Sequence, residues 1–534
     1  MKLRSAFILV ALSLAGAAAP AQPTLQLTVR SYDELGQAIQ RVAKAVDPDS
    51  QDDQAQQLGA HLGLTNLASF DAKRPWEIAL WYEAGGTPLL AFKGPIKELA
   101  SFKEGLNPKG LLRTQGKEWK QLENGLVSVT FKPSSDLTES EISALKQWNG
   151  QAIQPPNKTL ELSLKLGDAT RAQAKSLLGI ARMSAVQAME SGQNPAATGA
   201  NPKAMTGMFN AYFDLLDTIL EGFQELRLGV DVTSEALQLD ERITARPGSE
   251  LSKWMETPAE RLTASDLGSL DPNALFSVAA YVGKSDSLMK LTKQFTALGL
   301  QMQNMETNGP MLQDINALLD KMLPAKFTGS AYLKDGLSFA GVNTFPGGNV
   351  AEIYSQMKKF INQTLKSQVG KDKMYSAANL AEKHHTSEGV SVDRLSLTLN
   401  LDNPMFNVPG QKEQMKAFWP DGKMEFDYAL KDGKLLWASA AGNQMQALLA
   451  DKPNRKPTFD LQESSCLAGY LNLLGLIKLT IRANPMIPDE VKEKFSRLEP
   501  QNTSVDFQVS LDKQMHASGR VPLKLLHEMG RLKE

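Results

Sequence analysis

The most obvious group of potential metal ligands in this sequence surrounds the adjacent pair His384-His385 and includes Glu382, Glu388 and Asp393. Imidazole and carboxylate groups bind zinc and similar divalent cations. However, neighbouring histidines point in different directions on a helix or a strand, and the chain has no His-Glu-x-x-His motif and no Cys/His ligand spacing. We therefore interpret the segment as a solvated loop and predict no metal site.

Motifs for nucleophilic or phosphate chemistry are incomplete. Three Ser-x-x-Lys matches begin at Ser143, Ser287 and Ser355, but none is joined by the Ser-Asp-Asn or Lys-Thr-Gly motifs that complete a penicillin-binding site. The glycine-containing segment 110–117 has the wrong spacing for a phosphate-binding loop and lacks Ser or Thr after its lysine. We predict no catalytic and no cofactor-binding residue, and a hydrolase whose site is dispersed along the sequence stays as the alternative.

One stretch is unusually rich in methionine and aromatic residues at helical spacing. Its apolar positions are Met205, Met208, Phe209, Tyr212, Phe213 and Leu216. Acidic residues follow on the opposite side of the same helix, which gives it two distinct faces. Methionine is flexible and polarizable, which suits a surface that accepts varied apolar ligands. We take these six as candidate ligand-binding residues; the alternative is an ordinary helix face packed on a sheet, because exposed apolar patches are unusual in soluble proteins.

The surrounding elements are indicated by changes of hydrophobic period. Apolar residues alternate over 76–82, Gly85-Gly86 supplies a turn, 90–92 continue as a return strand, and 96–102 change to helical spacing. Such ββα units recur four more times, at 226–239, 333–336, 430–433 and 505–522. The predicted class is therefore α+β, with antiparallel sheets covered on one face by helices.

The order of these units suggests two duplicated halves, an N-terminal half over 22–256 and a C-terminal half over 272–534. Gly86 and Gly336 are 250 residues apart, and so are the opening strands at Leu25 and Leu275. Both halves end with two helices, a hairpin, a proline and a helix. The alternative is that ββα is a common unit whose recurrence needs no shared ancestry.

The apolar run from Leu467 to Ile481 is interrupted by Asn472 and Lys478 and is shorter than a transmembrane helix, so it predicts a buried core helix. The neighbouring Cys466 is the sole cysteine of the chain, which excludes an intrachain disulfide. Its apolar surroundings favour a buried, unreactive thiol.

The first 21 residues follow the pattern of an export signal. Lys2 and Arg4 are basic, residues 6–15 are apolar, and Ala19-Pro20-Ala21 matches a signal-peptidase site. We expect a mature chain that begins near Gln22 in the periplasm or outside the cell, with no transmembrane span. The 534 residues contain 58 Lys and Arg against 59 Asp and Glu, a balance that argues against nucleic acid as a partner.

Two short phrases, residues 71–78 (DAKRPWEI) and 245–251 (ARPGSEL), resemble uncharacterised secreted proteins of Gram-negative bacteria. The resemblance implies export and a non-catalytic role, and it assigns no site residue. We therefore expect an exported, non-enzymatic envelope protein that binds a partner or an apolar ligand without a cofactor. A dispersed hydrolase and a purely structural scaffold are the alternatives.

Overall fold

A computed structural model places the chain in two compact units. Unit 1 contains residues 1–181, 216–252 and 513–534, and unit 2 contains residues 182–215 and 253–512. The residues that the structure describes are 22–49, 56–57, 59, 69–82, 88–106, 117–122, 125–190, 202–256, 261–268, 270–271, 273–302, 310–333, 336–370, 373–403, 406, 410–440, 443–450, 460–484 and 487–533. The predicted signal peptide, the turn at Gly85-Gly86 and its counterpart Asp335 lie outside them.

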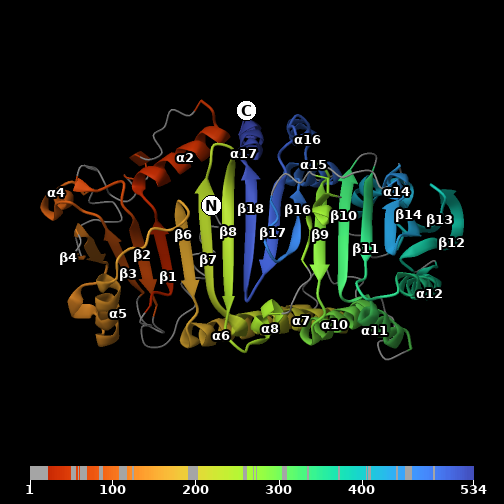
Figure 1. Cartoon of the computed structure of the whole chain (residues 1–534), viewed down its shortest axis with the longest axis horizontal. Coiled ribbons are helices and arrows are strands. Elements are labelled where there is room, and N and C mark those ends of the chain that lie inside the picture. Colours follow the sequence, from red (N-terminus) through yellow and green to blue (C-terminus); the bar gives the residue numbers. More distant parts are fainter. Residues whose placement is uncertain are drawn as a thin grey trace. The chain divides into compact units, whose positions relative to one another are not determined.

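Unit 1 contains an antiparallel sheet whose strands pair in the order β4-β5-β3-β2-β1-β6-β7-β8-β18. The strands are β1 (Leu25–Val29), β2 (Trp76–Trp81), β3 (Leu89–Gly94), β4 (Glu118–Gln121), β5 (Val127–Thr130), β6 (Leu160–Lys165), β7 (Phe223–Val232), β8 (Ala236–Ala245) and β18 (Gln514–Pro522). In Figure 1 the blue strand β18 lies beside β8, so the end of the chain completes a sheet that its beginning starts.

The helices that belong entirely to unit 1 are α2 (Tyr32–Val46), α4 (Leu99–Glu104), α5 (Glu139–Gly150) and α17 (Leu523–Gly530), with short 3-10 turns η3 (Ser134–Asp136) and η7 (Arg531–Lys533). The first turns of α2 and α5 are capped as the sequence dictates. The Ser31 hydroxyl accepts from the Glu34 amide, and Thr138 and Glu141 form a reciprocal capping box. Helix α17 packs on α2, where Gly530 approaches the Val46 carbonyl too closely for any side chain.

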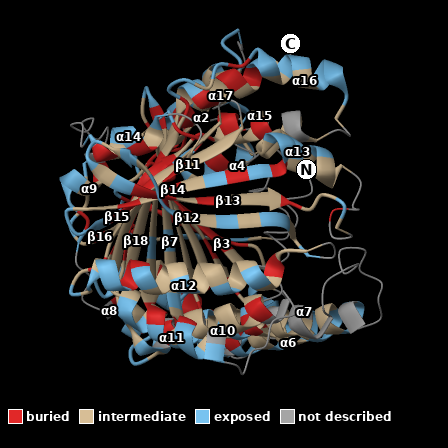
Figure 2. Ribbon diagram, turned by 90° about the vertical axis from the view of Figure 1, so that its right-hand side faces the viewer, coloured by how far each residue is buried: buried red, intermediate tan, exposed pale blue. Residues whose placement is uncertain are grey.

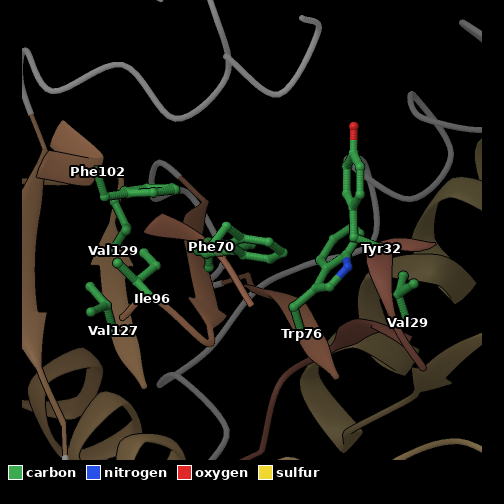
Figure 3. Close-up of a cluster of buried hydrophobic side chains, with 9 residues drawn as sticks. Val29, Tyr32, Phe70, Trp76, Ile96, Phe102, Val127 and Val129 are labelled. Atoms are coloured by element: carbon green, nitrogen blue, oxygen red, sulfur yellow. The ribbon is translucent and has the colours of Figure 1, made fainter. Parts of the chain in front are cut away.

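Helices cover both faces of the β2-β3 hairpin, and the prediction of one covered face is wrong there. One face carries a cluster that includes Val29, Trp76, Phe92 and Phe102, which Figure 3 shows in close-up. The opposite face carries Ala79, Trp81, Leu89, Ala91 and, from α5, Ala144, Leu145 and Trp148. Because successive strand residues point to opposite faces, both the odd and the even positions of these strands are buried.

The strands of unit 2 are also antiparallel and pair in the order β17-β16-β9-β10-β11-β15-β14-β13-β12. They are β9 (Phe276–Val282), β10 (Ala325–Leu333), β11 (Leu337–Thr344), β12 (Tyr375–Ser387), β13 (Val390–Leu399), β14 (Lys423–Lys431), β15 (Lys434–Ser439), β16 (Ser465–Leu471) and β17 (Val505–Leu511). The combination of antiparallel strands with helices confirms the predicted α+β class.

The helices of unit 2 are α9 (Ala264–Gly268), α10 (Asp286–Met302), α11 (Pro310–Met322), α12 (Val350–Gln368), α13 (Gln411–Phe418), the 3-10 turn η6 (Pro420–Gly422), α14 (Gln444–Leu449), α15 (Leu473–Ala483) and α16 (Asp489–Ser496). Helices α6 (Asp168–Glu190), α7 (Pro202–Gly222) and α8 (Glu250–Glu256) each belong partly to unit 1 and partly to unit 2. Exposed residues concentrate on the outer helices, as the mostly pale-blue α16 illustrates in Figure 2.

The apolar run from Leu467 to Ile481 is not one helix. Residues up to Leu471 form the end of β16, and a helix starts at Leu473. Asn472 separates them because its side-chain oxygen accepts from the Gly475 amide and caps α15. A buried strand and a buried helix can have the same apolar composition, so hydrophobicity does not show where one ends and the other begins. Here the cap residue Asn472 marks the boundary between β16 and α15.

Candidate functional site

Unit 2 contains an open cavity of about 990 Å³. Its apolar and aromatic lining residues are Leu275, Tyr332, Leu333, Leu337, Phe418, Trp419, Pro420, Met424, Phe426 and Ala440. Its polar lining residues are Asn273, Ser338, Lys423, Glu425, Ser439, Asn443, Gln444, Asn472 and Lys478. A concave, mostly apolar wall with a few polar groups is typical of sites for small ligands, and this volume is at the upper end of their usual range.

The turn between β10 and β11 and the segment that joins α13 to β14 form adjoining parts of the cavity wall. Gly336 in that turn has a φ of 148°, and a Cβ atom there would lie 3.0 Å from the Phe418 carbonyl oxygen and 3.2 Å from a Pro420 ring carbon. Glycine is therefore required for the approach as well as for the backbone angle. The close contact fixes the position of Phe418 and Pro420 in the wall.

Aromatic side chains make up much of the apolar wall. The rings of Phe418 and Trp419 are in edge contact with centroids 5.9 Å apart. Trp419 and Phe426 also pack against the small buried cluster of Leu399, Phe406 and Met424. The wall is thus attached to a core, which holds its aromatic surfaces in place before any ligand arrives.

The Gln444 amide is the polar group of the wall with an unsatisfied atom. Its Nε2 donates to the Ser338 hydroxyl at 3.1 Å, while its Oε1 is buried and has no hydrogen-bond partner in the part of the chain that the structure describes. Turning the amide over would exchange the two atoms and leave the nitrogen unsatisfied instead. The unsatisfied atom is shielded from solvent, and leaving a buried polar group without a partner is costly.

Among the described residues, three charged side chains line the cavity. Lys423 is exposed, and its ammonium group forms no hydrogen bond or ion pair with another described residue. Lys478 donates to the carbonyl oxygens of Ser496 and Leu498 at 2.9 and 2.8 Å. The carboxylate of Glu425 accepts from the Ser396 hydroxyl and lies 4.0 Å from the Arg394 guanidinium. The negative charge of Glu425 is thus partly compensated from outside the wall, whereas the Lys423 ammonium has no such partner among the described residues.

A separate polar network surrounds Asp393, a residue from the histidine-rich segment. Burial would raise the pKa of the Asp393 carboxyl, but hydrogen bonds from the Lys383 amide, the Tyr354 hydroxyl and the Lys358 ammonium hold that pKa below its ordinary value. Burial and donation to Asp393 raise the pKa of Tyr354. The network attaches α12 to the irregular pairing of β12 with β13.

His384-His385 lies in this irregular part of β12, so the prediction of a solvated loop is wrong. The two rings meet edge to face, with centroids 5.6 Å apart. Among the described residues, no group of three or more His, Cys, Asp and Glu side chains could hold a metal ion. Asp393 is occupied by Tyr354 and Lys358, which makes it a structural anchor.

The six residues predicted to bind a ligand lie in α7, and the four of them whose side chains are described, Phe209, Tyr212, Phe213 and Leu216, do not line the cavity. Phe209, Phe213 and Leu216 are half-buried, whereas Tyr212 is 52% exposed. The side chains of Met205 and Met208 lie outside the described part of the structure. Exposed large apolar side chains in the described parts of α6 and α7 are Leu177, Ile180, Met183, Tyr212 and Ile219.

Arg171 attaches the beginning of α6 to the end of α7. Its guanidinium donates to the carbonyl oxygens of Leu166, Leu220 and Phe223 and to the Asp168 carboxylate. Lys175 pairs with Glu221 further along the two helices. These contacts make α6 and α7 an antiparallel helix pair whose closed end is buried and whose outer surface carries apolar side chains.

Comparison with known proteins does not identify the chain: no protein family, no curated protein and no solved structure matches it. None of the helices in the described ranges combines the length and the apolarity needed to cross a membrane.

Sequence reasoning did not find the cavity because its wall comes from segments between Asn273 and Pro500. No local spacing connects such residues. The one available signal was Phe418-Trp419-Pro420-Asp421-Gly422, two large aromatics directly before turn-forming residues. Aromatic side chains next to a turn lie at the end of an element, where cavities can form.

Proposed function

We propose that this protein binds an amphipathic small ligand in the cavity of unit 2. The observation that carries the proposal is the cavity itself: about 990 Å³ with an aromatic and aliphatic wall and one half-satisfied buried amide. Apolar surface removed from water supplies the affinity, at about 25 cal/mol per Å². The sparse polar groups supply orientation, as in other ligand sites.

Binding is favoured over catalysis by where the perturbed titratable groups lie. Tyr354, Lys358 and Asp393 have shifted pKa values, and so do the ion pairs of α6, α7 and the nearby strands; none of these groups lines the cavity. Catalytic sites are usually where such shifts gather. A hydrolase with a dispersed site is the alternative, and it requires residues to converge elsewhere.

The experiment is binding of N-phenyl-1-naphthylamine, a neutral probe that fluoresces in apolar surroundings. Ala440→Trp places a large ring in the cavity and should abolish the fluorescence increase. Ala447→Trp is the matched control, because Ala447 is exposed on α14 and does not line the cavity. Equal probe binding by both variants, with unchanged melting temperatures, would contradict the proposal.

A second candidate is docking of an apolar partner on the part of α7 that belongs to unit 2. The 52% exposed side chain of Tyr212 favours it, because exposed apolar surface can mark an interaction site. This candidate function keeps a binding role for the apolar helix face predicted over Met205–Leu216. Tyr212→Ser should then weaken capture of the partner without changing probe binding in the cavity, and unchanged capture would exclude this surface.

We also propose export to the cell envelope and an origin by duplication. The pairing order of the strands supports a duplication, since β1 lies between β2 and β6 as β9 lies between β10 and β16, and β3 pairs with β5 as β11 pairs with β15. Superposing residues 24–255 on 274–532 of an experimental structure should pair Pro247 with Pro522. If these prolines fall on unrelated elements, the resemblance of the halves comes from common units alone.

A further inference from the structure

We infer that the ligand of the unit 2 cavity is an amphiphile with an anionic head, and that Lys423 binds this head. The inference rests on the proposed function and names the ligand class. It concerns one end of the cavity wall, where Lys423 begins β14 directly after the η6 turn and four residues after Trp419.

Lys423 has the properties of a ligand-binding cation. Its ammonium group forms no ion pair or hydrogen bond with another described residue, although it lines a cavity rich in aromatic side chains. Some surface lysines of the same unit form ion pairs, such as Lys321 with Glu352 and Lys293 with Asp320. An anionic head would give the Lys423 ammonium a charge-assisted hydrogen bond of this kind.

The other charges of the wall support an anion over a cation. The carboxylate of Glu425 already receives a hydrogen bond from Ser396 and the field of Arg394. A cationic head would be repelled by the Lys423 ammonium and would find only this partly compensated carboxylate. The Coulomb balance at the cavity therefore favours a negative head.

The apolar part of the wall suits the body of such a ligand. The aromatic rings of Trp419 and Phe426 line the cavity and pack against the buried cluster of Leu399, Phe406 and Met424. The apolar body of an amphiphile would therefore meet a wall that is already in place.

The test compares laurate with 1-dodecanol, which has the same chain length and no charge, each used below its aggregation limit to displace N-phenyl-1-naphthylamine. Wild-type protein should bind laurate about tenfold more tightly than dodecanol. Lys423→Met should remove that difference and leave dodecanol binding within about twofold. Lys434→Met is the control, since Lys434 is exposed in unit 2 and does not line the cavity.

The outcomes separate the inference from the proposed function. Equal affinity for laurate and dodecanol in the wild type, or laurate binding unchanged in Lys423→Met, overturns the anionic head and leaves the cavity as a binding site. Failure of the probe and of both amphiphiles to bind overturns the proposed function. Laurate affinity that falls with ionic strength, while dodecanol affinity does not, supports the assignment to a charge.

Discussion

Replacing the buried Lys93 with methionine should destabilise unit 1 strongly. Lys93 is 0% exposed and lies opposite Glu77 in the β2-β3 pair. Its ammonium is 2.8 Å from the Glu77 carboxylate and donates to the carbonyl oxygens of Trp148 and Gln151 at 2.8 and 2.9 Å. All three donors are therefore used, and two of them bind carbonyls at the C-terminal end of α5, where the last carbonyls of a helix lack partners within it and favour a positive charge.

The magnitude follows from what the substitution leaves behind. Methionine retains the length and most of the packing of lysine, but it leaves the buried Glu77, 3% exposed, without its ion-pair partner; the Gln26 amide still donates to the Glu77 carboxylate at 2.8 Å. Removing one partner of a buried ion pair costs about 3–5 kcal/mol. At about 2–4 °C per kcal/mol, the melting temperature of the unit should fall by roughly 6–20 °C.

The assay is calorimetric unfolding combined with hydrogen exchange of peptides from β2 and β3. Lys93→Met/Glu77→Gln removes both charges and keeps an acceptor for Gln26, so it should recover at least about half of the lost free energy. Lys120→Met, at an exposed position on β4, should change stability by less than about 0.5 kcal/mol. A Lys93→Met melting temperature within about 2 °C of the wild type, with no gain in the double variant, would refute the reasoning.

Four further expectations follow. Folding lowers the pKa of Asp393, so the ionised carboxylate stabilises the folded chain above about pH 4. This stabilisation disappears as the pH falls through the lower pKa of the folded state. Asp393→Asn should therefore reduce the free energy of unfolding at pH 6 and change it almost not at all at pH 2, as measured by urea unfolding. Arg171→Met should leave several buried carbonyls unsatisfied and cost about 3 kcal/mol, with faster hydrogen exchange in α6 and α7 as the readout and unchanged exchange as the contrary result. Mature protein from its native host should begin near Gln22, and peptide mapping that finds Met1 retained would refute export. Phe209→Asn should cost about 3 kcal/mol or more if Phe209 fills a core, whereas loss of a co-purifying apolar ligand at unchanged stability would place Phe209 in a binding face.

Local pattern alone determined much of the secondary structure. The alternation from Trp76 and the change to helical spacing at Ile96 correspond to β2, β3 and α4, and the strand from Phe276 followed by a helix corresponds to β9 and α10. These elements depend on the spacing of apolar side chains and on capping residues a few positions away. A single sequence contains all of this local information. The class of the fold follows from their order.

Tertiary structure decided what lies against these elements. The sequence contains Lys93 and Glu77 as two charged residues in apolar strands, but only strand register and the end of α5 make them a buried pair. The cavity likewise needs Gly336 against Phe418 and Gln444 against Ser338, contacts between residues about 80 to 106 positions apart. Such contacts arise from packing across the sheet and not from the spacing of apolar residues along the chain. For that reason the sequence indicated an apolar binding face on one helix, whereas the cavity lies between segments that are distant in the sequence.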